Sequence, residues 1–340
     1  MERLVTDMTE TEILFDLLEK GISPAHAVSA CEKRLTDAGF EVVDYGTAWN
    51  LKAGGKYVIN HHETTLFAFT LPQNWSDREP AIRIAAAHTD FPCLRIKPSC
   101  DIQTNGYAQV NVEVYGGAIL NTWLDRPLGV AGRVAVRSGD VFTPKVVTFQ
   151  SEKNLMTIPN LAIHMNREVN KGVELNKQTE LLPICGLSDD ADYFLDFLAK
   201  ELAVKKEDIL DFELTIYNKE KPEFVGLNDE FISASRLDNL NSCSALVSAI
   251  IDSDRADGMN LIALFDHEEI GSRSKQGAGS ILLHDMLVRI LTECGLEKEV
   301  WNRLYNSIIL SVDVAHGLHP NYAGKMDLTN KPVRSEERRV

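Results

Sequence analysis

Three short apolar runs along this chain end in clusters of polar side chains. They are "AIRIAAAHTD" (81–90), "NLIALFDHEE" (260–269) and "NSIILSVDVAHG" (306–317). Continuous apolar runs of this length are typical of strands that are buried on both faces of a sheet. Helical periodicity alternates with them, in "SASRLDNLNSCSALVSAIID" (233–252) and "HDMLVRILTEC" (284–294). The alternation predicts an α/β domain whose parallel sheet is covered by helices.

The N-terminal part predicts a pair of helices. The first twenty residues, "MERLVTDMTETEILFDLLEK", follow an amphipathic helical pattern. Ser23 and Pro24 are typical of a helix N-cap and first turn, and Gly39 is typical of a helix end. The first segment has neither a basic start nor a continuous apolar region, so it is not expected to be a signal peptide.

The middle of the chain follows a different pattern. "YAQVNVEVYGGAIL" (107–120) alternates polar and apolar residues, and "GVAGRVAVRSGDVFTPKVVTF" (129–149) does the same around the turn "SGD". This alternation indicates strands, and helical periodicity is scarce here. We therefore expect a β-rich insertion over residues 97–227, between a first part of the α/β domain at 1–96 and a second part at 228–340.

Charge and composition argue against several classes of partner and of protein. The formal net charge is -15, and no basic patch precedes the last few residues, so nucleic acid is not an expected partner. No apolar run is long enough to predict a membrane span. The six cysteines form no CxxC pair, which argues against a zinc ribbon and against a disulfide-stapled secreted fold, and favours a cytoplasmic protein with reduced thiols.

Acidic residues and one histidine gather where the predicted strands end. In an open α/β sheet the carboxyl ends of the strands converge on one crevice, where functional side chains collect. A mixed set of imidazole and carboxylate ligands suits zinc, or manganese or cobalt, and two divalent cations would neutralise acids that otherwise repel one another. The residues concerned are His88, Asp90, Asp238, Glu268, Glu269 and Asp313.

This set predicts a metal-dependent hydrolase, in which a free glutamate takes a proton from water. The alternative for any single acid at a strand end is a helix cap or a solvated loop residue. We expect His61, His62 and His284 to be surface or core groups without a functional role. His267 would face away from the site if its segment were extended, so we interpret it as structural.

The motifs resemble one known family. "AAAHTDFPCLRIKP", "SRLDNLNSC", "FDHEEIGSRSKQGAGS" and "SVDVAHGLHPNYAGKM", with "IPNLAIHMNREVN" (158–170) among them, resemble the aspartyl aminopeptidases, which are cocatalytic zinc exopeptidases. The resemblance covers nearly the whole chain. It implies a phosphorylase/hydrolase-like zinc exopeptidase domain, an inserted β-rich dimerisation domain, and a dodecamer built from dimers. It also implies removal of an N-terminal acidic or neutral residue from peptides.

The resemblance also implies a role for each matched residue. His88 and Asp313 would bind the first metal, Asp238 would bridge two metals, and Glu269 would bind the second. Glu268 would be the general base, and Asp90 would orient His88. Two histidines would contact substrate: His316, and His164 from the inserted domain, which would reach a neighbouring subunit's active site. His319 is left as a loop residue.

The chain departs from the family pattern near its end. Family members continue past the equivalent of "GKMDLTNKPV" through a final metal-binding histidine and a lysine-containing stretch linked with acidic specificity, whereas "RSEERRV" follows Val333 here. The second metal would then keep only Asp238 and Glu269. Two hypotheses therefore stay open: an active metallo-aminopeptidase, and a truncated, catalytically impaired homologue that retains the fold and subunit assembly.

Overall fold

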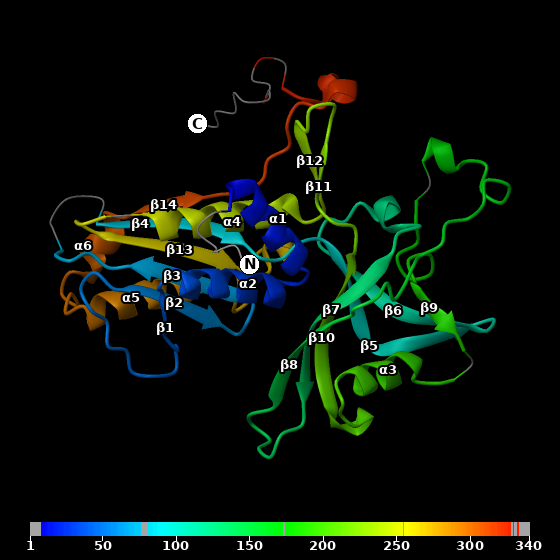
Figure 1. The fold of residues 1–340 in the computed structure, drawn as a ribbon, viewed down its shortest axis with the longest axis horizontal. Coiled ribbons are helices and arrows are strands. Elements are labelled where there is room, and N and C mark those ends of the chain that lie inside the picture. The colour runs from blue at the N-terminus through cyan, green and yellow to red at the C-terminus, as the bar shows by residue number, and fades with distance from the viewer. Residues whose placement is uncertain are drawn as a thin grey trace.

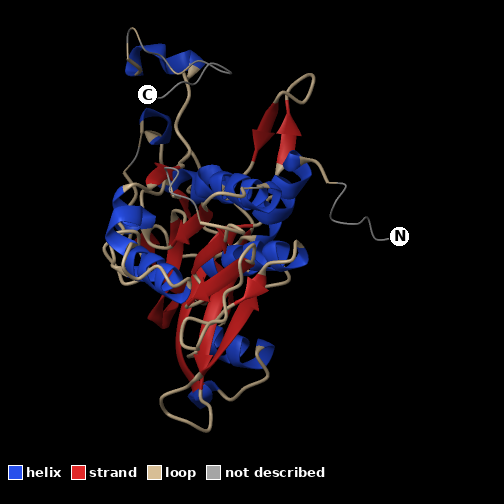
Figure 2. Ribbon diagram, turned by 90° about the vertical axis from the view of Figure 1, so that its left-hand side faces the viewer, coloured by secondary structure: helices blue, strands red, loops and turns tan. Residues whose placement is uncertain are grey.

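The structure of the chain, a computed structural model, describes residues 8–75, 81–172, 174–188, 190–253, 255–327, 329 and 332. Two sheets lie side by side, the first with helices on both faces and the second with α3 (Tyr193–Glu201) packed against it (Figures 1 and 2). This arrangement agrees with the expected α/β domain and β-rich insertion. The segment after Val333, where the sequence departs from the family pattern, lies outside the described residues.

The first sheet has the strand order β1-β2-β3-β13-β4-β14. Strands β13 and β4 are parallel, and so are β4 and β14, but β3 runs antiparallel to both β2 and β13. The expectation of a parallel sheet is therefore wrong for β3, which joins β2 through a tight turn instead of a helical crossover. The strands are β1 (Glu41–Val42), β2 (Lys56–His61), β3 (Thr65–Thr70), β4 (Ile82–His88), β13 (Met259–Phe265) and β14 (Ile308–Ser311).

Helices cover both faces of this sheet (Figure 1). One apolar core lies between the sheet and α1 (Glu10–Lys20), α2 (Pro24–Asp37) and α4 (Leu237–Asp252). The core on the other face contains α5 (Leu282–Glu293) and the start of α6 (Val300–Tyr305). The N-terminal helix pair is confirmed, because the side chain of Ser23 caps α2 and Pro24 occupies its first turn.

Strand β14 departs from the sequence expectation. We predicted from its apolar run that it is buried on both faces, but all four residues of β14 are exposed. The reason is its place at the edge of the sheet, where it pairs only with β4 among the described residues. By contrast, β3 in the interior of the sheet is buried at every position.

The second sheet has the strand order β8-β7-β10-β5-β6-β9, and all its pairs are antiparallel. Its apolar core includes Phe194 and Leu198 of α3 (Tyr193–Glu201), which packs against β5. The expected boundary at residues 96 and 97 lies within β5. The strands are β5 (Cys93–Thr104), β6 (Tyr107–Tyr115), β7 (Leu128–Val136), β8 (Lys145–Gln150), β9 (Ile184–Leu187) and β10 (Ile209–Asn218).

A short hairpin leads from the second sheet back to the first. It consists of β11 (Glu223–Val225) and β12 (Phe231–Ser233), and it projects from the body of the molecule (Figure 1). All six cysteines are free thiols in the structure. Within the described part of the chain, no helix combines the length and apolar character needed to span a membrane.

Candidate metal centre

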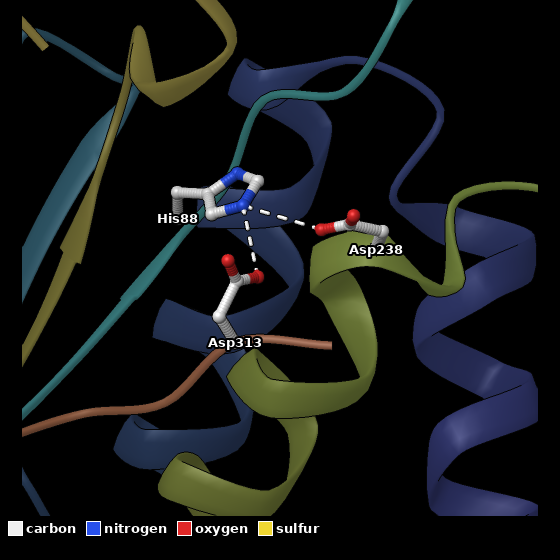
Figure 3. A group of neighbouring side chains, drawn as sticks. All are labelled: His88, Asp238 and Asp313. Carbon is white, nitrogen blue, oxygen red and sulfur yellow. Dashed lines mark ion pairs between the residues drawn. The ribbon is translucent and has the colours of Figure 1, made fainter. Parts of the chain in front are cut away.

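Three of the expected ligands meet at the carboxyl ends of the strands of the first sheet. His88 is the last residue of β4, Asp238 lies in the first turn of α4, and Asp313 follows β14 by two residues. The Nε2 atom of His88 lies 3.3 Å from Oδ1 of Asp238 and 3.5 Å from Oδ1 of Asp313 (Figure 3). One ligand atom from each residue lies within 4.8 Å of the other two. The carboxyl ends of β4 and β14 therefore converge as the sequence predicts.

Asp90 contacts the imidazole of His88 through its backbone and its side chain. The Nδ1 atom of His88 lies 3.0 Å from the backbone oxygen of Asp90 and 3.3 Å from its Oδ1. Both neighbours accept hydrogen bonds, so Nδ1 carries the proton and Nε2 is free to bind a cation. Asp90 is fully buried and also accepts hydrogen bonds from the backbone N–H groups of Glu268 and Glu269, at 3.0 and 3.1 Å.

The first turn of α4 is irregular, and this places Asp238 at the centre. Arg236 has a left-handed backbone (φ 64°), and Asp238 has the extended angles φ -82° and ψ 109°. The Asn239 side chain then donates a hydrogen bond to the backbone oxygen of Val312, over 3.0 Å. The start of α4 is thereby attached to the residue that precedes Asp313.

The paired glutamates begin a single turn of 3-10 helix, η5 (Glu268–Ile270). The Oε2 atom of Glu268 lies 3.8 Å from Nε2 of His88, so this carboxylate faces the same space as the three ligands. Glu269 is outside the group formed by those ligands. Its carboxylate lies against Gly116, since a Cβ added to that glycine would be 2.8 Å from Oε2 of Glu269.

Without a cation the carboxylates of the site repel one another. Burial and then the charge of Asp313 raise the pKa of Asp238. Burial also raises the pKa of Glu269, and the charges of Asp90 and Asp238 add to this, against a hydrogen bond from the Gly117 backbone. The raised pKa values of these neighbouring acids show that their charged forms are destabilised. A bound cation would stabilise the charged carboxylates.

The pKa of the site's histidine is also raised, and for an imidazole this favours the charged form. Burial lowers the pKa of His88, but its hydrogen bond with Asp90 and the surrounding carboxylates outweigh burial and raise the pKa to about 9. Asp90 keeps a lowered pKa in spite of burial because His88 and Tyr115 donate hydrogen bonds to it. A positive charge is therefore favoured at the position of Nε2.

The other histidines lie outside this group. His164 and His316 are exposed and do not belong to the cluster of ligands. The Nδ1 atom of His319 accepts a hydrogen bond from the Asn321 backbone at the start of η6 (Pro320–Lys325), which is a local structural role. His61, His62 and His284 are likewise not part of the cluster.

The prediction that His267 lies in an extended segment is wrong. Strand β13 ends at Phe265, and His267 has a left-handed backbone (φ 65°) at the start of η5. Its structural interpretation nevertheless agrees with its contacts, because Nδ1 lies 2.7 Å from Oγ of Ser274 and Nε2 lies 3.4 Å from Asp266. The ring holds the turn that presents the two glutamates.

A cavity of about 480 Å³ opens beside Asp238, lined in part by residues of β7 and β10 and by the segment that leads from β12 to α4. Phe91, Trp123 and Tyr217 supply apolar walls, and Arg236 supplies a cation. Burial lowers the pKa of Arg236 to about 10, and its Nη2 donates a hydrogen bond to the backbone oxygen of Leu18 over 2.7 Å. Sequence reasoning missed this cavity, although "SRLD" places Arg236 two residues before the expected bridging aspartate.

Comparison with known proteins identifies the family. Residues 17–336 match the family model described as "Aminopeptidase I zinc metalloprotease (M18)". The chain belongs to this family. It is therefore a metallo-aminopeptidase by descent, as the resemblance of its motifs implied, and zinc is the metal of its family.

Relatives and solved structures agree with this assignment. A protein of Clostridium novyi (strain NT) named "Probable M18 family aminopeptidase 2" is 41% identical over 325 residues, which are 94% of this chain and 75% of that relative. The structure titled "Cryo-EM structure of the Ape4 and Nbr1 complex" has a TM-score of 0.86 at 32% identity and covers 98% of this chain and 69% of its own. The S. cerevisiae mApe1 dodecamer has a TM-score of 0.78 at 26% identity, over 96% of this chain and 76% of its own.

Proposed function

We propose that this metallo-aminopeptidase removes one N-terminal residue, acidic or neutral, from peptides by means of two divalent cations and a glutamate base. The observation that carries the proposal is the convergence of His88, Asp238 and Asp313, with Glu268 facing the same space. Nitrogen and carboxylate ligands fit zinc, and manganese or cobalt would fit the same atoms.

The side chains divide into ligands and a base. His88 and Asp313 would hold the first cation, Asp238 would bridge, and Glu269 would hold the second. In support, the charge of Asp238 is among the causes that raise the pKa of Glu269, as expected for acids that share a cation. When bound, the cations lower the pKa of water and polarise the peptide carbonyl.

Glu268 would carry the proton through the reaction. The oxygen of water forms a bond with the carbonyl carbon of the first peptide bond, and Glu268 accepts the proton that this water loses. Glu268 then donates the proton to the leaving amine as the carbon–nitrogen bond breaks. The products are a free amino acid and a peptide shortened by one residue. The exposed position of Glu268 beside His88 suits this movement.

The neighbouring cavity supports a peptide substrate. Its volume of about 480 Å³ accommodates an amino acid side chain next to Asp238, and its walls combine aromatic rings with Arg236. An arginine whose charge is enclosed suits an acidic substrate group, while the aromatic rings suit a neutral side chain. We propose that His316 contacts substrate as well.

We further propose that the protein is a homo-oligomer, a dodecamer built from dimers, in which the β-rich residues 97–227 form the dimer contact. The support is the likeness to the S. cerevisiae mApe1 dodecamer. In such an assembly the exposed His164 would reach the active site of a neighbouring subunit. Light scattering on the purified chain tests the mass, and loss of activity on dilution to monomers tests the role of His164.

The central experiment measures release of free amino acids from peptides that begin with aspartate, glutamate, alanine or leucine. The protein is first treated with a chelator and then supplied with zinc, manganese or cobalt. We expect turnover with at least one cation and none with the chelator. Absence of turnover with every cation would contradict the proposal and support the impaired homologue, which the family comparison does not favour.

A further inference from the structure

We propose that residues 115–117, at the end of strand β6, form a positioning element of the metal centre. Tyr115 would hold Asp90 in place, and the two glycines would hold Glu269. This inference rests on the proposed function, since it assigns these residues to the support of a cation site. The alternating pattern of this segment indicates a strand and no functional role, and Tyr115 belongs to the second sheet instead of the sheet that carries His88.

Tyr115 is bonded to the residue that orients His88. Its hydroxyl donates a hydrogen bond of 2.6 Å to Oδ2 of Asp90. A short bond from a hydroxyl to a buried carboxylate is among the stronger hydrogen bonds in proteins. The ring is only 6% exposed, and the guanidinium of Arg95 lies 3.8 Å from its centroid. The phenol is therefore fixed in one orientation.

Loss of the Tyr115 hydroxyl would change the geometry of the site by freeing the carboxylate of Asp90. Oδ1 of Asp90 contacts His88 and the Glu268 backbone, while Oδ2 accepts from Tyr115 and the Glu269 backbone. Without Tyr115, Oδ2 would keep a single described donor, and the carboxylate could rotate. Rotation would misplace both the imidazole and the turn that presents the glutamates, and partners of this kind affect metal affinity strongly.

The glycines after Tyr115 act on Glu269. Gly116 has a φ of +71°, and a Cβ at this position would lie 2.8 Å from Oε2 and 3.0 Å from Cβ of Glu269. The backbone N–H of Gly117 donates a hydrogen bond to the Glu269 carboxylate. The carboxylate can approach the backbone this closely only because residue 116 has no side chain.

The two contacts tie the metal centre to both sheets. Tyr115 is paired in register with Cys93, so its position depends on the β5–β6 pair. His88 and Glu268 depend on β4 and β13 of the first sheet. A displacement between the sheets would therefore change the geometry of the ligands. This gives the second sheet a part in metal binding besides any part in assembly.

The first test compares Tyr115→Phe with Tyr107→Phe. Tyr107 starts the same strand and is 45% exposed, so its variant controls for the loss of one phenol hydroxyl from β6. The dissociation constant for zinc is measured on the full chain by competition with a chelating dye, and cobalt absorption spectra report the ligand geometry. We expect Tyr115→Phe to weaken zinc binding about 10-fold or more and to change the cobalt spectrum, whereas Tyr107→Phe stays within about twofold of the parent protein.

The second test compares two glycines with similar backbones. Gly116→Ala and Gly106→Ala both place a side chain at positive φ (+71° and +81°), but a Cβ at residue 106 would meet nothing within 4 Å. Both variants therefore carry the backbone strain, and only Gly116→Ala displaces Glu269. We expect weaker binding of the second equivalent of zinc in Gly116→Ala alone.

The outcomes separate this inference from the function on which it rests. If the parent protein binds neither zinc nor manganese nor cobalt, both fail. If the parent binds zinc and Tyr115→Phe and Gly116→Ala match their controls in affinity and cobalt spectrum, only the inference is overturned. If Tyr115→Phe loses thermal stability, the comparison of Gly116→Ala with Gly106→Ala still tests the inference. Both of these variants carry a similar backbone strain, so a difference in zinc binding would come from the contact with Glu269.

Discussion

The side-chain amide of Asn239 donates a hydrogen bond of 3.0 Å to the backbone oxygen of Val312, and this bond joins the start of α4 to the end of β14. Asn239 is fully buried. Asp238 and Asp313 are the chain neighbours of the two bonded residues. The bond therefore holds together the backbone segments of two residues whose carboxylates repel each other in the absence of a cation.

We expect Asn239→Ala to weaken zinc binding about 10-fold, because the two ligands would no longer be held together. The unpaired carbonyl of Val312 would also lower the free energy of unfolding by about 1–3 kcal/mol. Ser242→Ala, at a buried position of the same helix, is the control for stability. Zinc affinity equal to that of the control would show that this bond does not organise the site.

Glu268→Gln should separate catalysis from metal binding. The substitution keeps the shape of the side chain and removes its capacity to accept a proton, so we expect turnover to fall about 10²- to 10⁴-fold. Zinc content, measured by elemental analysis, should stay near that of the parent protein. The control is Glu297→Gln, since Glu297 is an exposed glutamate that follows α5 and lies outside the site. Full activity in Glu268→Gln would exclude Glu268 as the base.

The sequence was sufficient to predict the edge of the sheet where the site lies. Apolar runs identified β4 and β13, and the polar residues that follow them must share an edge because these strands are parallel. His88 and Glu268 could be placed together for this reason. The same reasoning named Asp313 after the third apolar run and Asp238 at the start of a helical segment, and the family motifs then assigned their roles.

The remaining features depend on contacts that local sequence does not encode. Tyr115 reaches Asp90 from a different sheet, and nothing in the alternating pattern of β6 reveals which sheet lies beside its end. The left-handed backbone of His267 was missed because histidine does not require positive φ. The exposure of β14 follows from strand order, which hydrophobic runs alone do not define.

Zinc should stabilise the folded protein through Asp313. A ligand that binds only the folded state adds about 2.7 kcal/mol to the free energy of unfolding at a free concentration of 100 times its dissociation constant. We expect zinc to raise the melting temperature of the chelator-treated parent protein, and Asp313→Asn to lose most of this increase. Asp285→Asn, with a side chain that is 44% exposed, should respond like the parent. An unchanged zinc response in Asp313→Asn would remove Asp313 from the ligands.

His26 should make the folded state sensitive to mild acid. Burial lowers the pKa of this imidazole from 6.5 to about 4, and its Nδ1 lies 2.7 Å from Oγ of Ser23 at the start of α2. Between pH 6.5 and 4 the unfolded chain binds a proton at His26 that the folded chain does not. The free energy of unfolding therefore falls as the pH drops through this interval, and it is unaffected by His26 above it.

We expect His26 to account for a loss of about 1–2 kcal/mol between pH 7 and pH 5. Urea unfolding at both pH values, followed by fluorescence, measures this loss in the parent protein and in His26→Gln. The variant should lose less stability on acidification because glutamine does not titrate. His284→Gln is the matched control, since His284 has a side chain that is 50% exposed. An equal pH dependence in His26→Gln and the parent would show that His26 is protonated in the folded chain as readily as in the unfolded one.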